Sequence, residues 1–320
     1  MTTAPFRCGV ASADRGEEPA GTASTVRAFL LLEHPGPWGV DALRDARLPD
    51  GLGPRIAAAA ATARVRPLLV RRPGRTRGAT TGATTGATTG AATGDGLRVF
   101  AASCLPGATR LESGTVTDPH EVLDLDLASL RAGGSSGLDP HHGTVLAVCT
   151  HGRHDACCAE LGRPVAAALA AAHPEETWEV SHIGGDRYAG NLLVLPDGLY
   201  YGRLDPDAAL AVAAAHARDH LEFDHLRGRT AYPMAVQAAE VALRRHLGET
   251  RRDVVRWTGR SVEGPATNLV TTAVFDVAGR TWSVRVRTVE GPPARLTCRA
   301  TRDNPTPRHE VEAVTSEDDG

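Results

Sequence analysis

The sequence predicts an α/β fold made of two α/β halves followed by a strand-rich C-terminal segment. Short apolar runs alternate with Ala-rich segments of helical periodicity in both halves, and this alternation is typical of the α/β class. From residue 253 to 299 the pattern is strand-like, with a turn at Ala278-Gly279. A chain of 320 residues favours about two domains.

The first half contains strand-like and helix-like segments in the order of an α/β unit. Predicted strands, all short and apolar or alternating, cover residues 26–33, 65–72, 97–104 and 121–127. Between the first two strands, residues 40–46 and 55–63 are predicted to be helical. The prolines and glycines of HPGPWG end the first strand and turn the chain.

Two segments rich in small residues divide the chain. Residues 78–94 repeat a four-residue unit of Gly, Ala and Thr, which cannot bury a core, so we expect a low-complexity surface loop at 76–96. The Gly/Ser-rich residues 131–137 predict a domain boundary. We therefore expect an N-terminal α/β domain at 1–135, a second domain at 136–310 and a disordered tail at 311–320.

The second half is predicted to run strand, helix, strand, hairpin, helix. The corresponding segments are 144–149, 160–173, 177–182, 190–204 and 205–220, and a further helix is expected at 233–247. Pro164 fits the first of these helices only in its first turn. This order of elements is that of a thioredoxin-like core, and the strand–helix–strand order of the first half is consistent with a second copy.

Composition narrows the classes of function. With 42% hydrophobic and 23% charged residues the chain can bury a core, and a net charge of −3 gives no reason to expect nucleic acid. We see no secretory signal and no apolar run of about 18–20 residues, so we expect a cytoplasmic protein without a membrane partner. Six cysteines in a reducing compartment favour metal binding or redox chemistry over disulfides.

Residues 149–186 hold the densest group of possible metal ligands. Cys149 and Cys158 lie at opposite ends of a polar loop, so their thiolates can converge on one metal. His182 ends a predicted strand, and the Gly184-Gly185 pair lets Asp186 turn back beside it. Two sulfur ligands and two N/O ligands are what a metal or iron–sulfur site needs.

Neighbouring residues have less specific interpretations. Cys157 and His154 are alternative ligands, although an adjacent cysteine usually packs and loop histidines are usually solvated. Side chains expected to surround the ligands are Arg153, Asp155, Arg187 and Asn191. Buried thiols without a partner are expected at Cys8, Cys104 and Cys298.

Four ordered motifs resemble the sucrase/ferredoxin-like family, whose members are thioredoxin-like ferredoxins with a Rieske-like [2Fe-2S] cluster. The motifs are CTHGRHDACC at 149–158, WEVSHIGGDRYAGN at 178–191, LPDGLYYGR at 195–203 and LRGRTAYPMAVQAAE at 226–240. The resemblance implies cysteine ligands at Cys149 and Cys158 and histidines in an H-x-G-G-H pattern. His182 matches the first histidine, and Asp186 stands where the second would be.

The resemblance implies one-electron transfer at a [2Fe-2S] cluster in the 136–310 domain, and it favours a redox carrier over a substrate-converting enzyme. Three arrangements are open: Asp186 ligates iron, Cys157 or His154 takes the fourth place, or no cluster binds; we favour Asp186. Zinc held by the same Cys/His/Asp set is the alternative cofactor. A thiol–disulfide enzyme ranks last because Cys-x-x-Cys is missing. The expected partner is a redox protein or a small reductant.

Overall fold

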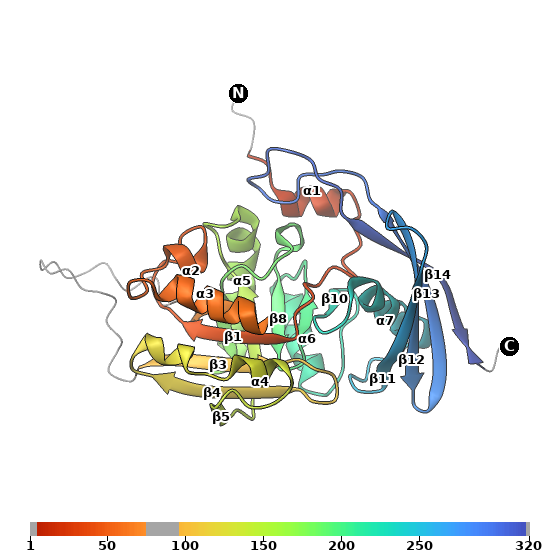
Figure 1. The fold of residues 1–320 in the computed structure, drawn as a ribbon. Helices are drawn as coiled ribbons and strands as arrows, with labels where there is room; N and C mark the ends of the chain where they lie inside the picture. Colours follow the sequence, from red (N-terminus) through yellow and green to blue (C-terminus); the bar gives the residue numbers. More distant parts are fainter. Residues whose placement is uncertain (1–4, 75–95, 318–320) are drawn as a thin grey trace, which may run out of the picture.

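The computed structural model describes residues 5–74 and 96–317 (Figure 1). These residues form a mixed α/β structure with a ten-stranded mixed sheet and a C-terminal four-stranded antiparallel sheet. The predicted low-complexity loop at 76–96 falls, except for its last residue, outside the described residues. Among those that are described, we find no helix with both the length and the apolar character needed to cross a membrane.

Both halves of the chain contribute strands to the large sheet. The first half contributes β1 (Ala28–Glu33), β2 (Arg66–Arg71), β3 (Leu97–Ser103), β4 (Arg110–Val116) and β5 (Asp139–Pro140). The second half contributes β6 (Val145–Cys149), β7 (Thr177–Val180), β8 (Leu192–Leu195), β9 (Leu199–Tyr201) and β10 (Leu226–Arg229). Their order across the sheet is β10-β9-β8-β6-β7-β2-β1-β3-β4-β5.

The two halves repeat one topology. β1 is parallel to β2 and antiparallel to β3, and β6 is parallel to β7 and antiparallel to β8. The halves join where β2 and β7 pair antiparallel over only Val70↔Val180 and Arg71↔Glu179. The loops that follow β1 and β6 therefore meet near this junction. Strands from both sides of residue 135 share the sheet. The domain boundary expected there stays a prediction.

Helices cover the outer faces of the two half-sheets. The described helices are α1 (Cys8–Asp14), α2 (Ala42–Asp45), α3 (Leu52–Ala63), α4 (Leu127–Arg131), α5 (Ala156–Ala172), α6 (Pro206–His216) and α7 (Met234–Leu247), with 3-10 turns η2 (Pro119–Leu123) and η3 (Asp186–Tyr188). Hydrophobic side chains of α3 and α4 pack on the first half-sheet, and those of α5 and α6 pack on the second.

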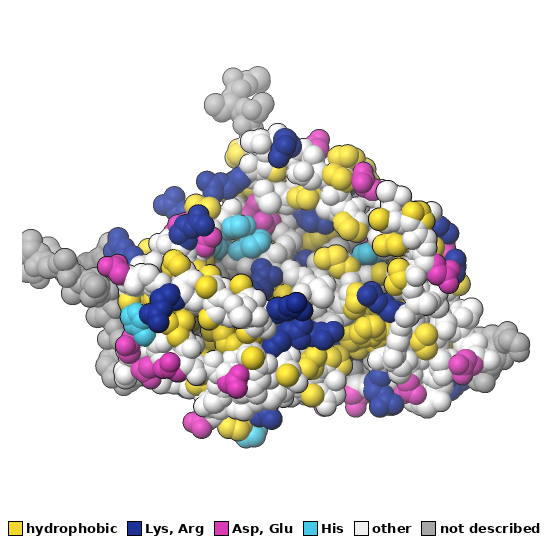
Figure 2. All heavy atoms as spheres, in the orientation of Figure 1, with side chains coloured by type: hydrophobic (Ala, Val, Ile, Leu, Met, Phe, Trp, Pro, Cys, Tyr) yellow, Lys and Arg dark blue, Asp and Glu magenta, His cyan; other side chains and the backbone are white. Residues whose placement is uncertain are grey.

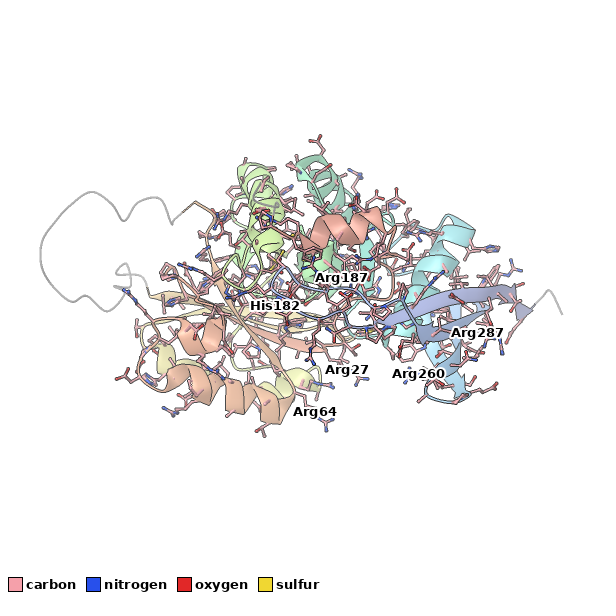
Figure 3. All side chains as sticks on the ribbon, turned by 90° about the horizontal axis from the view of Figure 1, so that it is seen from above. Arg27, Arg64, His182, Arg187, Arg260 and Arg287 are labelled. Atoms are coloured by element: carbon pink, nitrogen blue, oxygen red, sulfur yellow. The ribbon has the colours of Figure 1, made fainter. Side chains whose placement is uncertain are left out.

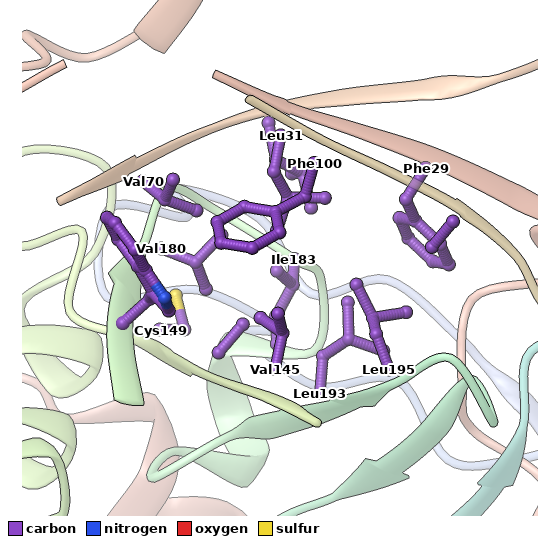
Figure 4. Packing of buried hydrophobic residues seen from close by; sticks show 14 of the residues in the cluster. Phe29, Leu31, Val70, Phe100, Val145, Cys149, Val180, Ile183, Leu193 and Leu195 are labelled. Carbon is purple, nitrogen blue, oxygen red and sulfur yellow. The ribbon is translucent and has the colours of Figure 1, made fainter. Parts of the chain in front are cut away.

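Alternation along β6 places Cys149 in the central core. Val145, Ala147 and Cys149 point into a cluster that also contains residues of β1, β2 and β3, while Leu146 and Val148 face the α5 and α6 side. Figure 4 shows Cys149 at an edge of this cluster beside Val180. The inner faces of the two half-sheets thus pack on each other, and the cysteine lies at the margin of that packing.

The C-terminal sheet consists of β11 (Val255–Glu263), β12 (Asn268–Val277), β13 (Arg280–Glu290) and β14 (Pro307–Ser316) and packs on α7. The turn predicted at Ala278-Gly279 is confirmed, with φ of 51° and 86°. The tail expected from residue 311 is wrong up to Ser316, because the 307–316 segment pairs with β13. Residues 318–320 lie outside the described residues.

Two other sequence expectations need correction. Residues 121–127 do not form a strand, because Asp118 and Glu121 make a capping box that starts the 3-10 turn η2. The helix expected at 160–173 begins earlier, at Ala156, because the Asp155 side chain caps it by accepting a hydrogen bond from the Cys157 N–H. Pro164 therefore lies inside α5 and not in its first turn.

A buried ion-pair group joins the two sheets through α7. Glu240 Oε1 lies 3.0 Å from Arg229 Nε in β10 and 2.9 Å from Arg244 Nε in α7. Arg244 also donates to the carbonyls of Arg251 and Arg252, just before β11. Burial alone would raise the pKa of Glu240, but the two guanidinium groups outweigh it and lower the pKa below its ordinary value.

We expect Glu240→Gln to lower the free energy of unfolding by about 3–5 kcal/mol, because it leaves two buried guanidinium charges uncompensated. Urea denaturation of the full chain measures the change. The matched control is Glu249→Gln, whose partner Arg251 is exposed, and it should cost less than about 1 kcal/mol. Equal losses in the two variants would contradict this account of the junction.

Candidate metal centre

The junction of β6 and α5 sets the positions of the two candidate cysteine ligands. Cys149 is the last residue of β6, and Cys158 lies in the first turn of α5; both are buried. α5 packs so closely on the strand end that a Cβ at Gly162 would overlap the carbonyl oxygen of Cys149. Glycine at this position therefore allows the first turn of the helix to bring the two thiols together.

The thiols of Cys149 and Cys158 lie in contact. A hydrogen bond from Cys158 outweighs burial and lowers the pKa of Cys149 to about 7. The same contact, together with burial, raises the pKa of Cys158. Cys158 Sγ also lies 3.2 Å from Asp186 Oδ1, to which it donates. The pair is thus prepared to lose protons to a metal, starting with Cys149.

The predicted turn at the glycine pair is present and returns the chain to His182. Gly184 and Gly185 have φ of 96° and 79°, in the left-handed region that favours glycine. The turn buries Asp186, and His182 Nδ1 lies 2.9 Å from Asp186 Oδ1. Burial raises the pKa of Asp186, but His182, Cys158 and His154 together lower it below its ordinary value.

Arg227 braces this turn, and sequence reasoning missed it. It is fully buried in β10, and it donates to the Gly184 carbonyl (3.0 Å) and to Asn191 Oδ1 (2.8 Å). Asn191 in turn donates to the Gly185 carbonyl at 2.9 Å, so it contacts the turn that carries Asp186. A Cβ at Gly185 would overlap the guanidinium group. The only sequence signal that could have pointed to Arg227 is its place in the LRGR motif at 226–229.

The loop after β1 forms the outer wall of the site. His151 Nε2 lies 3.0 Å from the Gly39 carbonyl, and its Nδ1 accepts a hydrogen bond from the His182 backbone N–H at 3.1 Å. Burial lowers the pKa of His151 to about 4, so its ring is neutral and donates from Nε2. Both ring nitrogens are occupied, and His151 is a structural residue of the loop.

His154 is the remaining histidine at the site. Its ring stacks on that of His182 with centroids 3.8 Å apart, and its Nε2 lies 3.7 Å from Asp186 Oδ2. The Nδ1 atom of His154 lies 3.3 Å from the carbonyl oxygen of Val40. His154 is therefore within reach of the centre as the alternative ligand that the sequence indicated.

The imidazoles lie at the surface and the sulfurs lie inside. His154 and His182 line a pocket of about 550 Å³ with Val40 and Arg66, and the side chain of His182 is 28% exposed. Figure 2 shows histidine and acidic side chains together at a hollow in the surface, and Figure 3 places His182 near the middle of the molecule seen from above.

Three of the predicted surrounding residues lie elsewhere. The Arg153 carbonyl accepts a hydrogen bond from Arg299, and Arg187 forms an ion pair with Glu17 beside α1 (Figure 3). Asp155 and the alternative ligand Cys157 face away from Cys149, toward Cys8 and Cys298. The expectation of thiols without a partner is therefore wrong for Cys8 and Cys298.

The candidate ligands could hold a metal and fall into two subsets. In the described part of the chain, His154, His182 and Asp186 have ligand atoms that all lie within 4.8 Å of one another. Cys149 and Cys158 do not belong to this group. The His182 Nδ1 atom is buried without an aligned hydrogen-bond partner. A buried imidazole nitrogen beside a carboxylate, next to a pair of thiols, is suited to metal ligation.

A family model described as sucrase/ferredoxin-like matches residues 19–228, which is more than half of the chain. The chain belongs to the sucrase/ferredoxin-like family. The region that this sucrase/ferredoxin-like chain shares with the family includes all four candidate ligands and Arg227, and excludes α1, α7 and the C-terminal sheet. No curated protein and no solved structure matches the chain significantly.

Gly162→Ala tests the close packing that positions Cys149. Alanine in place of glycine within a helix normally stabilises by roughly 1 kcal/mol, but here we expect a loss of about 1–3 kcal/mol because the new methyl group overlaps the strand end. Urea denaturation measures this change in the free energy of unfolding. Gly259→Ala is the control, since nothing lies within 4 Å of its added Cβ. Stabilisation by Gly162→Ala would refute the packing argument.

Proposed function

We propose that this chain is an iron–sulfur electron-transfer protein with a [2Fe-2S] cluster. Cys149 and Cys158 would hold one iron, and His182 and Asp186 would hold the other. The observation that carries the proposal is the convergence of a buried thiol pair with a His–Asp pair, linked by the 3.2 Å contact between Cys158 Sγ and Asp186 Oδ1. When bound, such a cluster supplies one-electron oxidation and reduction.

The division of the four candidate ligands into a thiol pair and a His–Asp pair supports a cluster over a mononuclear site. The thiols contact each other, and His182 contacts Asp186, but the four ligand atoms do not form one group within 4.8 Å among the described residues. A single zinc ion would need all four ligand atoms at the corners of one tetrahedron around it. Two irons, each with its own pair of ligands, match this division.

The protein's own residues would set the properties of the centre. The buried sulfurs restrict water to the histidine side, where His182 and the pocket offer the shortest route for an electron to a partner. Asp186 is anionic, and an anionic ligand stabilises the ferric state more than a neutral imidazole does. We therefore infer a lower reduction potential than a bis-histidine centre would have.

We further infer a thioredoxin-like arrangement for the cluster-binding half. Its strand order β7-β6-β8-β9, with α5 between β6 and β7, supports this inference. The absence of a Cys-x-x-Cys motif favours a redox carrier over a thiol–disulfide enzyme. The electron partner would be a redox protein or a small reductant that reaches the pocket beside His182. A reducing compartment would keep the ligand thiols available, so we infer a cytoplasmic location.

Zinc is the second candidate, in a different arrangement from the one the sequence suggested. His154, His182 and Asp186 place three ligand atoms within 4.8 Å of one another, which is close enough for one ion. Water would complete such a site. A colourless protein with zinc that depends on His154 would favour this candidate over the cluster.

We expect protein purified without oxygen to absorb visible light, to bleach with dithionite and to contain about two irons per chain with acid-labile sulfide. Cys158→Ser should lose the colour and most of the iron. The control is Cys104→Ser, since Cys104 is a buried free thiol in the central core, outside both the iron ligands and the Cys8/Cys298 group. Iron that is unaffected by Cys158→Ser would overturn the proposal.

Asp186→His tests the role of the carboxylate. We expect the reduction potential to rise, because a neutral imidazole donates less charge to iron than a carboxylate does. The potential should also become more dependent on pH, because the variant gains a titratable ligand. Redox titration at several pH values measures both effects.

His154→Gln is the matched variant for this titration, because it changes the neighbouring imidazole and leaves the proposed ligands in place. Its potential should stay close to that of the wild type. An unchanged or lower potential in Asp186→His, or a loss of iron in His154→Gln, would contradict ligation by Asp186.

A further inference from the structure

A second group of possible metal ligands lies beside the candidate cluster site. It contains three thiols and one carboxylate from distant parts of the chain: Cys8, Asp155, Cys157 and Cys298. Their ligand atoms all lie within 4.8 Å of one another, and all but Cys298 are fully buried. Cys157 and Cys158 are adjacent in sequence, yet their side chains contribute to the two separate groups.

The distances within this group match the edges of one metal tetrahedron. Cys157 Sγ lies 3.4 Å from Cys298 Sγ, which lies 3.6 Å from Cys8 Sγ. Cys8 Sγ lies 3.5 Å from Asp155 Oδ1. A tetrahedral zinc with bonds of about 2.3 Å to sulfur and 2.0 Å to oxygen has S···S edges of about 3.8 Å and S···O edges of about 3.5 Å.

The surroundings suit thiolates and a carboxylate. The Gly9 backbone N–H donates to Cys157 Sγ at 3.4 Å, and the Cys298 N–H donates to Asp155 Oδ2. The N-terminus of α5, which Asp155 caps, directs its positive end at the same place. Each carboxylate oxygen has a second lone pair, so capping the helix leaves Asp155 able to bind a metal.

We propose that Cys8, Cys157, Cys298 and Asp155 form a zinc site that fastens α1 and the connection between β13 and β14 to the start of α5. Zn²⁺ would replace the three thiol protons, which leave to solvent, without any change of oxidation state. Zinc fits because it accepts mixed thiolate and carboxylate ligands in a closed tetrahedron. The site uses none of the four residues assigned to the iron centre, so it stands independently of that proposal.

The topology gives the site a structural role. Cys8 begins α1, and Cys298 lies in the 16-residue connection between β13 and β14, residues 291–306. Figure 1 shows this connection lying against α1. The Arg7–Glu160 ion pair adds a weaker contact between the N-terminal segment and α5. One bound ion would join three segments that lie far apart in the sequence.

The metal content of reduced full-length protein tests the site. Protein incubated with Zn²⁺ and then desalted should keep one zinc per chain. Cys298→Ser and Cys8→Ser should each lose it and keep the iron, whereas Cys158→Ser should keep the zinc. Cys104→Ser, which changes a buried thiol outside both groups, should keep both metals. Cys298 is half-buried in a loop, so its replacement leaves the core intact.

Each contrary outcome is distinct from failure of the iron proposal. Reduced wild-type protein that retains no zinc would overturn the zinc site, whatever its iron content. Zinc that survives Cys298→Ser but disappears in Cys158→Ser would also overturn it, because the ion would then occupy the other centre. Absence of iron together with zinc that depends on Cys8 and Cys298 would support the zinc site and refute only the cluster.

Proteolysis supplies a second readout that does not depend on counting metal. Arg299 and Arg302 are exposed in the connection that carries Cys298, so trypsin can cut there once the connection opens. Cleavage should be slow in the zinc-loaded wild type and several-fold faster in Cys298→Ser. It should be equally fast in wild type stripped by a chelator. Equal cleavage rates with and without zinc would contradict a fastening role.

Discussion

The close approach of α5 to the end of β6 is the constraint on which both candidate centres depend. Only glycine at position 162 allows the helix to start beside Cys149, and Asp155 fixes where the helix starts. Because successive residues of a helix point about 100° apart, Cys157 and Cys158 then face different neighbours. Cys157 faces Cys298, and Cys158 faces the His182–Asp186 pair. The packing of α5 on the end of β6 thus directs Cys157 and Cys158 into two different sets of sulfur ligands.

The duplicated topology explains why a half without candidate iron ligands still contributes to the site. β2 and β7 overlap only at their ends, so the loop after β1 reaches the histidines that follow β6. Gly39 fixes the tautomer of His151, whose Nδ1 then accepts from the backbone N–H of His182. The charged pair of Arg71 and Glu179 crosses the same junction at 2.7 Å. Positioning of the proposed ligands therefore depends on both halves.

Local patterns predicted most strands, the hairpin at 190–204 and the glycine turn before Asp186, because sequence neighbours alone determine them. The strand predicted at 121–127 was wrong, since alternating Leu and Asp also fits the 3-10 turn that the Asp118 capping box starts. Contacts of long sequence separation left no local signal: Cys8 and Cys298 meet across 290 residues. Arg227 could not be placed at the turn for the same reason, because strand pairing in the folded sheet brings it there.

Anomalous X-ray scattering at the iron edge, from crystals grown without oxygen, tests the central claim most directly. We predict two adjacent iron peaks, one within bonding distance of Cys149 and Cys158 and the other beside His182 and Asp186. A single peak among His154, His182 and Asp186, or no iron signal in protein that has been reconstituted with iron and sulfide, would contradict a [2Fe-2S] centre at this site.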